Sequence, residues 1–314
     1  MKILFTSLFV SFLKKTQQKG RGIFMTELIS IKANAKINLY LNVTAKRNDG
    51  YHLIESVMQS ISLYDIVNIK KNDTDTIRIN CNHPDIPCDN SNIAYKAAEA
   101  FFKSSSIKRI GIDISIEKNI PSQAGLGGGS ADGAAVLAGL NQLCETHLTI
   151  NQLCTIGSKI GADIPFCLIG GTALCTGVGD VIKSLNNLTE CYIVIGKGDK
   201  GISTSSAYSE IDARNLMNKS DIDVYNIFNN SNLSEISLGC YNVFEEVAGL
   251  DKVNTIKKIL TSYNALTAHM SGSGSAVYGI FTDKHNAEQC CIKLKKDGYF
   301  TALCNPDNKG CYIN

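Results

Sequence analysis

The sequence predicts a mixed α/β fold, and three observations support this prediction. The chain has 314 residues, which at about 100–200 residues per domain corresponds to one large domain or two modest ones. Hydrophobic residues make up 44% and charged residues 19%, a globular balance that excludes a disordered or collagen-like chain. Segments in which apolar residues alternate are interleaved with segments of helical periodicity.

The individual elements can be placed by these two periodicities. Residues 28–43 alternate loosely and predict a strand or a strand pair, followed by a turn at Arg47-Asn48-Asp49-Gly50. Residues 218–238 are rich in Asn, Ser and Asp, and we interpret them as a variable surface excursion. Further strands are expected at 66–70, 77–80, 110–117, 172–176, 191–195 and 276–281, and helices at 92–102, 131–144, 151–160, 203–217, 253–263 and 287–296.

The first 24 residues differ from the remainder. An apolar run at 3–13 is too short to span a bilayer, which needs about 20 residues, and no small-residue cleavage site follows it. A second methionine, Met25, favours a dispensable extension or a start codon called too early, with a targeting peptide as the alternative. We therefore expect three parts, at 1–24, 25–184 and 185–314, with the domain boundary near 184–189.

Charge and cysteine content exclude several classes of protein. The net charge of +2 provides no strong field for nucleic acid or an anionic membrane. The 12 cysteines contain no CxxC pair and the five histidines no HExxH spacing, so a structural zinc site is not predicted. A chain of this length needs no disulfides, and we interpret the cysteines as reduced thiols.

A glycine-rich segment, Pro121-Ser122-Gln123-Ala124-Gly125-Leu126-Gly127-Gly128-Gly129-Ser130, stands between a predicted strand and an Ala-rich helix. Glycines let backbone N–H groups approach a ligand, and a helix N-terminus adds unpaired N–H groups and partial positive charge. This arrangement predicts a cradle for phosphate oxygens. The alternative is a flexible loop that ends in an ordinary N-cap at Ser130.

Two other nucleotide-binding patterns fit the chain poorly. The P-loop pattern GxxxxGK[ST] is absent. A GxGxxG occurs at Gly196, Gly198 and Gly201, but no helix opens at the third glycine and no strand with a terminal acidic residue follows. We interpret this second pattern as coincidental.

Three segments together resemble the GHMP kinases, the superfamily of galactokinase, homoserine kinase and mevalonate kinase. The glycine-rich segment is similar to their second motif, and Met270-Ser271-Gly272-Ser273-Gly274-Ser275-Ala276 to their third. Ala35-Lys36-Ile37-Asn38-Leu39, Gly50-Tyr51-His52 and Gly161-Ala162-Asp163-Ile164-Pro165-Phe166 resemble segments of one member family, the 4-diphosphocytidyl-2-C-methyl-D-erythritol kinases. Asn34 replaces that family's usual proline, and Gly133 a common alanine.

The resemblance implies a two-domain α+β fold, with an N-terminal domain like ribosomal protein S5 domain 2, a C-terminal ferredoxin-like domain, and the active site in the cleft between them. It implies a small-molecule kinase that uses ATP with Mg²⁺ to phosphorylate the 2-hydroxyl of a cytidyl-diphospho sugar alcohol in the methylerythritol phosphate route to isoprenoids. Neither a nucleic-acid nor a membrane partner is implied. We expect a cytoplasmic monomer or weak homodimer, or a plastid stromal enzyme if the extension is a transit peptide.

Roles for individual residues follow by position in the family motifs. Lys36 and Asp163 would be catalytic, although Asp163 could instead form a structural salt bridge or cap a turn before Pro165. Tyr51 and Tyr208 would sandwich the cytosine while His52 hydrogen-bonds its edge, and Asn38 and Thr204 would be further substrate contacts. The ATP-binding residues would be Pro121, Gln123, Ala124, Gly125, Leu126, Gly127, Gly128, Gly129, Ser130 and Ala131.

Two competing functions remain at this point. Another GHMP kinase, acting on homoserine, a sugar or a mevalonate, would lack a need for the Gly50-Tyr51-His52 element. A non-catalytic binding protein on the same scaffold would have no physical need for Lys36, Asp163 and the glycines together.

Overall fold

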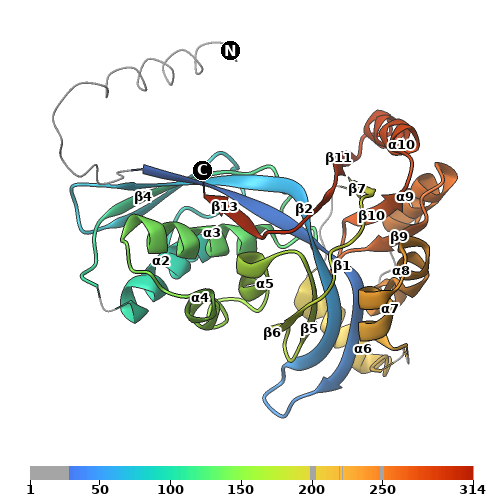
Figure 1. Cartoon of the computed structure of the whole chain (residues 1–314), viewed down its shortest axis with the longest axis horizontal. Coiled ribbons are helices and arrows are strands. Elements are labelled where there is room, and N and C mark those ends of the chain that lie inside the picture. The colour runs from blue at the N-terminus through green and yellow to red at the C-terminus, as the bar shows by residue number, and fades with distance from the viewer. Residues whose placement is uncertain are drawn as a thin grey trace.

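The computed structural model describes residues 28–105, 107–198, 203–218, 220, 222–247 and 251–313. The extension proposed at 1–24 lies outside these residues, as does Gly201 of the GxGxxG pattern. Two β-sheets organise the chain, a larger one formed mainly by the first half and a smaller one formed by the second (Figure 1). Both sheets, together with the helices and loops attached to them, contribute residues to one cavity.

The larger sheet is built on one long hairpin. Strand β1 (Leu28–Lys46) pairs antiparallel with β2 (His52–Lys71) across the turn predicted at Arg47 to Gly50. The central order is β13-β1-β2-β4-β3, with further strands attached to β1, β2 and β5. The other strands are β3 (Ile77–Cys81), β4 (Ile112–Glu117), β5 (Thr172–Thr176), β6 (Val181–Ser184), β8 (Tyr241–Asn242), β12 (Pro306–Asp307) and β13 (Cys311–Ile313).

Four helices cover one face of this sheet (Figure 1). They are α2 (Ile93–Ser104), α3 (Gly128–Leu143), α4 (Ile150–Gly157) and α5 (Ile164–Ile169). Side chains of Asn92 and Thr149 cap α2 and α4. Helix α3 packs closely on the sheet, because a Cβ at Gly139 would lie 2.7 Å from atoms of Ile31 and Ile69. The core therefore lies between α3 and the long hairpin.

The smaller sheet has the order β11-β7-β10-β9, and all neighbouring strands are antiparallel. Its strands are β7 (Tyr192–Lys197), β9 (Thr267–Met270), β10 (Val277–Phe281) and β11 (Phe300–Cys304), and its helices include α6 (Thr204–Ala213), α9 (Asp251–Ser262) and α10 (Lys284–Lys296). This order and connectivity are ferredoxin-like, as expected. Gly196 and Gly198 lie at the end of a strand in an antiparallel sheet, where a dinucleotide fingerprint would need a parallel one.

Two expectations about elements were wrong, and the first part of β2 is among the elements that were not predicted. Residues 218–238 contain α7 (Val224–Asn230) and α8 (Leu233–Gly239), which bury Val224, Phe228 and Ile236. The glycine-rich helix begins at Gly128, three residues before the predicted start. The first part of β2 was not predicted, because Ser56, Gln59 and Ser60 are buried and break the apolar alternation.

The chain passes from the larger sheet to the smaller one between β6 and β7, close to the boundary expected at 184–189. The short η1 (Val243–Glu246) follows β8, which pairs with β1 of the larger sheet, and β12 and β13 return to that sheet at the end of the chain. A division into parts at 25–184 and 185–314 therefore stays a prediction.

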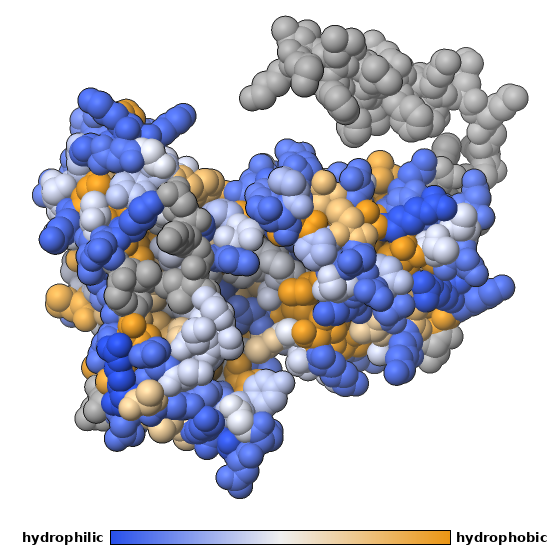
Figure 2. Space-filling view, turned by 180° about the vertical axis from the view of Figure 1, so that it is seen from behind, coloured by the Kyte–Doolittle hydropathy of each residue, from blue (hydrophilic) through white to orange (hydrophobic). Residues whose placement is uncertain are grey.

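The described cysteines are all free, as the sequence predicted. Burial raises the pKa of the Cys175 and Cys191 thiols to about 12, so these groups stay protonated and unreactive. Within the described part of the chain, no helix is long and apolar enough to cross a membrane. The face shown in Figure 2 is mostly hydrophilic, with hydrophobic residues in small groups.

Candidate active site

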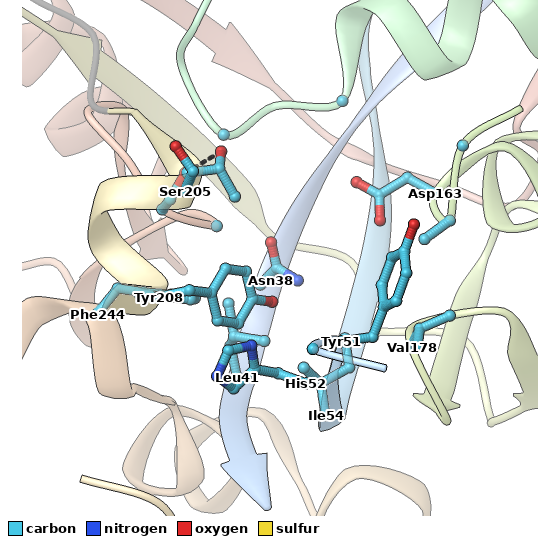
Figure 3. Close-up of a pocket in the computed structure, with 18 of the residues that line it drawn as sticks. Asn38, Leu41, Tyr51, His52, Ile54, Asp163, Val178, Ser205, Tyr208 and Phe244 are labelled. Carbon is cyan, nitrogen blue, oxygen red and sulfur yellow. Dashed lines mark hydrogen bonds between the residues drawn. The ribbon is translucent and has the colours of Figure 1, made fainter. Parts of the chain in front are cut away.

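A cavity of about 980 Å³ lies where the long hairpin, the glycine-rich loop, α5 and α6 meet. Figure 3 shows Asp163 and Tyr51 on one side of it, Ser205, Tyr208 and Phe244 on the other, and Asn38 between them. Residues far apart in the sequence therefore face a common space, and all seven predicted catalytic and substrate-binding residues line it.

The glycine-rich loop leads into the N-terminus of α3. Gly127 is the N-cap, with a φ of 71° that a side chain rarely adopts. The first intrahelical bond runs from the Ala131 N–H to the Gly127 carbonyl, at 2.8 Å. The N–H groups of Gly128, Gly129 and Ser130 have no intrahelical acceptor, because the residues four positions before them lie outside the helix. Ser130 thus lies within the first turn, and the N-cap role considered for it was wrong.

Close packing explains why glycine is needed in this loop. A Cβ at Gly125 would lie 1.9 Å from the Ser271 carbonyl oxygen, and one at Gly127 would lie 2.9 Å from Cγ of Lys36. The loop is also hydrogen-bonded on both sides, with Lys36 N–H donating to the Leu126 carbonyl and Ala276 N–H to the Ala124 carbonyl. The glycine-rich loop is therefore a fixed part of the site rather than a flexible connection.

The second glycine-rich turn, residues 271–275, packs beside the first. The Ser271 hydroxyl donates to the Gly125 carbonyl at 2.9 Å. Asn242 holds this turn, because its Nδ2 donates to the carbonyls of Met270 and Gly272 at 2.7 and 2.8 Å. Glu245 accepts the Met270 N–H at 2.6 Å. Asn242 and Glu245 therefore hold the second glycine-rich turn in place.

Lys36 and Asp163 form an ion pair within the cavity. Lys36 Nζ lies 3.4 Å from Asp163 Oδ2 and donates to Asn38 Oδ1 at 2.7 Å. The Lys36 side chain is 5% exposed and that of Asp163 is 30% exposed, so the ammonium is enclosed while the carboxylate remains open to a ligand. Asp163 is the residue before α5, where the turn aims its side chain into the cavity (Figure 3).

Asn38 is fixed by several bonds. Its Nδ2 donates to the Ser56 hydroxyl at 2.8 Å, and that hydroxyl donates in turn to the Tyr40 carbonyl. Its backbone N–H donates to the Ser271 hydroxyl at 3.2 Å. Since Asn38 also receives a bond from Lys36, this chain of bonds sets the direction of the Lys36 ammonium.

The opposite end of the cavity is aromatic. The His52 and Tyr208 rings are stacked, with centroids 4.6 Å apart and an interplanar angle of 19°. Phe244 packs edge-on against Tyr208 at 5.0 Å, whereas Tyr51 is 65% exposed. One face of Tyr208 is thus covered by His52 in this structure, so a base between Tyr51 and Tyr208 would use another part of the ring surface.

Asp212 is a site residue that the sequence analysis missed. Its Oδ1 lies 2.7 Å from His52 Nε2 and its Oδ2 2.5 Å from Lys46 Nζ. These two hydrogen bonds lower the pKa of the Asp212 carboxyl group. The available signal was spacing, because Asp212 follows Tyr208 by four residues and so shares its face of α6.

The remaining predicted residues are the substrate contact Thr204 and the set predicted to bind ATP. The Thr204 hydroxyl lies 2.9 Å from the Ser273 hydroxyl and lines the cavity. Among the predicted ATP-binding residues, Gly125 and Gly127 line this cavity, whereas Ala124, Leu126 and Ala131 have buried side chains that leave backbone groups for contact. Pro121, Gln123, Gly128, Gly129 and Ser130 belong to the same loop and first turn without lining the cavity.

Comparisons with known proteins bear on this site. The models of the GHMP kinase N-terminal domain and of the GHMP kinase C-terminal domain match residues 92–171 and 248–299. A 4-diphosphocytidyl-2-C-methyl-D-erythritol kinase of Clostridium tetani is 44% identical over 270 residues, covering 85% of this chain and 96% of that protein. The enzyme of the same name from Caldicellulosiruptor bescii is 43% identical, covering 88% of this chain and 98% of that protein. The chain belongs to the 4-diphosphocytidyl-2-C-methyl-D-erythritol kinase family.

Solved structures agree with this assignment. A crystal structure of a 4-(cytidine 5'-diphospho)-2C-methyl-D-erythritol kinase superposes with a TM-score of 0.74 at 26% identity, covering 88% of this chain and 98% of that one. A crystal structure of a homoserine kinase from Cytophaga hutchinsonii superposes with a TM-score of 0.72 at 18% identity. It covers 95% of this chain and 100% of that one, and it shows that the fold is shared. As a member of its family, this chain is an ATP-dependent kinase of the GHMP fold.

Proposed function

We propose that the chain transfers the γ-phosphoryl group of ATP to the 2-hydroxyl of 4-diphosphocytidyl-2-C-methyl-D-erythritol. The products are the 2-phosphate and ADP, in the methylerythritol phosphate route to isopentenyl diphosphate. The observation that carries the proposal is the Lys36–Asp163 pair, at 3.4 Å, in the cavity that Gly125 and Gly127 also line. The names of relatives more than 40% identical support the choice of substrate.

The phosphates of ATP would bind at the N-terminus of α3. The N–H groups of Gly128, Gly129 and Ser130 have no intrahelical acceptor, and the helix dipole favours an anion at this end. The positive φ of Gly125 and Gly127 shapes the loop that precedes them. Backbone groups can thus hold phosphates without a side chain in the way.

Asp163 would accept or orient the proton of the attacking hydroxyl. Phosphoryl transfer has a loose transition state, so positioning and charge stabilisation outweigh bond formation to a base. A partly open carboxylate within one hydrogen bond of the hydroxyl performs both tasks. The enclosed Lys36 ammonium keeps Asp163 oriented and offsets negative charge on the transferring group.

Mg²⁺ would accompany the nucleotide and would offset part of the negative charge of its phosphates. Magnesium bound with a nucleotide keeps waters and phosphate ligands and needs few protein groups. Among the described residues, no three or more His, Cys, Asp or Glu side chains gather where they could hold a metal ion. We assign the ion no protein ligand.

Tyr51, His52 and Tyr208 would recognise the cytosine, with Asn38 and Thr204 as further substrate contacts. The aromatic end of the cavity supports this role, since flat rings suit a base. His52 Nε2 is engaged by Asp212, so Nδ1 is the ring nitrogen that would reach the edge of the base. The free cysteines suit the reducing cytoplasm, where we propose that the protein acts as a monomer or weak homodimer.

An ADP-release assay tests the proposed function. ATP and Mg²⁺ are supplied with the cytidyl-diphospho substrate, and in parallel with homoserine, mevalonate and galactose. We expect release only with the first acceptor. Turnover of one of the others instead would assign the chain to a different GHMP activity, and no turnover with any acceptor would support a binding protein.

A further inference from the structure

A buried lysine lies behind the N-terminus of α3. Lys118 follows β4, and its side chain turns inward and is 5% exposed. Its Nζ contacts Asp65 on β2 and lies 2.6 Å from Asp132 Oδ2 on α3, and these two carboxylates are 0% and 6% exposed. Burying three charged groups together costs free energy, which their mutual attraction offsets only where the geometry is good and further hydrogen bonds are made.

This cluster connects three parts of the chain around the glycine-rich loop. Asp65 Oδ1 accepts the backbone N–H groups of Asn119 and Ile120, at 2.6 and 2.8 Å, and so fixes the segment that enters the loop. Asp132 lies in the second turn of α3. The Lys118 ammonium joins both carboxylates, so the loop entrance and the helix are held against β2 by the same group.

The ammonium also lies directly against the first residue of the helix. A Cβ added at Gly128 would be 3.3 Å from Lys118 Nζ and 3.1 Å from the Ile120 side chain. Gly128 carries one of the N–H groups without an intrahelical acceptor. The position of this group therefore depends on where Lys118 and Ile120 lie.

The charges of the cluster matter for an anion bound at this helix end. Two carboxylates face one ammonium, and Asp132 Oδ1 is buried without a hydrogen-bond partner among the described residues. Burial and the Asp65 charge raise the pKa of Asp132, while Lys118 opposes them. Without Lys118, two buried carboxyl groups would remain beside a site that must attract phosphates.

We propose that Lys118 is a positioning residue for the phosphoryl donor, which holds the N-terminal turn of α3 in place and offsets the two carboxylates behind it. Lys118 does not touch the substrate and acts through Gly128 and Asp132. The inference rests on the proposed function, since it assumes that the phosphates of ATP bind at this helix end.

The primary test compares Lys118→Met with Lys118→Arg, and uses the exposed Lys103→Met as a matched control. The measurements are the Kd of ATP by calorimetry, the KM of the acceptor alcohol, and the Tm. We expect Lys118→Met to raise the Kd of ATP about tenfold or more while the acceptor KM changes less than about threefold. Lys118→Arg should restore most of the affinity. Equal effects on both ligands, or none in a folded protein, would overturn the proposal.

A double variant separates positioning from stability if Lys118→Met folds poorly. Lys118→Met/Asp132→Leu removes one of the two carboxylates together with the ammonium, while Asp65 keeps the N–H groups of Asn119 and Ile120. Replacing buried ion pairs by apolar groups often preserves stability. We expect the Tm to recover while the Kd of ATP stays raised. If affinity recovers along with the Tm, Lys118 has a purely structural role and the inference is wrong.

The wild-type protein distinguishes failure of this inference from failure of the proposed function. If the wild type neither binds ATP nor phosphorylates the cytidyl-diphospho substrate, the proposed function fails and the inference falls with it. If the wild type does both and the Lys118 variants behave identically, only the role of Lys118 is refuted.

Discussion

The Lys36 ammonium and the Asp163 carboxylate lie 3.4 Å apart, although Lys36 stands in β1 and Asp163 directly before α5. Lys36 is enclosed and Asp163 partly open, so the pair presents an oxygen rather than a nitrogen to the cavity. A carboxylate that faces an acceptor alcohol, with a cation behind it, suits phosphoryl transfer.

Replacing the carboxylate should remove most of the activity. Asp163→Asn keeps the size of the side chain but loses the charge and the proton acceptor, so we expect kcat to fall about 100-fold or more. Folding should be preserved, because the side chain makes no capping hydrogen bond to α5. Steady-state kinetics check this, with the exposed Asp75→Asn as control. An activity within about tenfold of the wild type would contradict the role of Asp163.

Removing the His52 ring should raise the KM of the cytidyl-diphospho substrate more than the KM of ATP. His52→Ala deletes the ring that stacks on Tyr208 and bonds Asp212, so we expect the KM of the cytidyl-diphospho substrate to rise about tenfold or more. The KM of ATP should stay within about threefold. The exposed His285→Ala is the matched control, and a similar rise in both KM values would remove the base-recognition role of His52.

A methyl group at Gly127 should disturb the position of Lys36. Gly127→Ala forces an alanine to a φ of 71° and places its Cβ 2.9 Å from Lys36 Cγ, so both stability and kcat should fall. Gly298→Ala is the matched control variant, because Gly298 also has a positive φ, of 84°, but has open space around it. Both variants should lose about 1–2 kcal/mol of unfolding free energy.

Denaturant unfolding and steady-state kinetics separate the two effects. We expect kcat to fall about tenfold in Gly127→Ala only, since only that methyl group meets Lys36. Equal kcat values for the two variants would show that the contact with Lys36 does not matter for turnover.

The Glu245 carboxyl group should contribute to stability in a pH-dependent way. Burial would raise the pKa of Glu245, but hydrogen bonds from His269, Lys257 and the Met270 N–H outweigh it and lower the pKa below 4.5. A lowered carboxyl pKa means that the stabilisation is complete above about pH 4.5 and is lost as the pH falls through the folded-state pKa.

Glu245→Gln should therefore lower the Tm at pH 7, and the difference from the wild type should shrink as the pH falls below about 4.5. Thermal unfolding between pH 7 and 3 measures this difference. The exposed neighbour Glu246→Gln provides the control. A difference that stays constant over the whole range would show that the Glu245 charge does not stabilise the fold.

Several features could be predicted from the sequence because they depend on neighbouring residues. The helix after the glycines, the strand β5 at its observed bounds and the hairpin turn before Tyr51 follow from periodicity, glycine and turn chemistry. The prediction of a surface excursion at 218–238 was wrong. The segment is mostly polar, and its few apolar residues, Val224, Phe228 and Ile236, gave too weak a periodicity to indicate that they are buried.

By itself the sequence determined the motifs, the mixed α/β class and the residue types in and around the glycine-rich loop. Only the tertiary structure decided which distant groups meet, including Lys36 with Asp163, His52 with Tyr208 and Asp212, and Lys118 with Asp65 and Asp132. The physical reason is range: backbone preference and periodicity act within a few residues, whereas ion pairs and ring stacking depend on how separate elements pack.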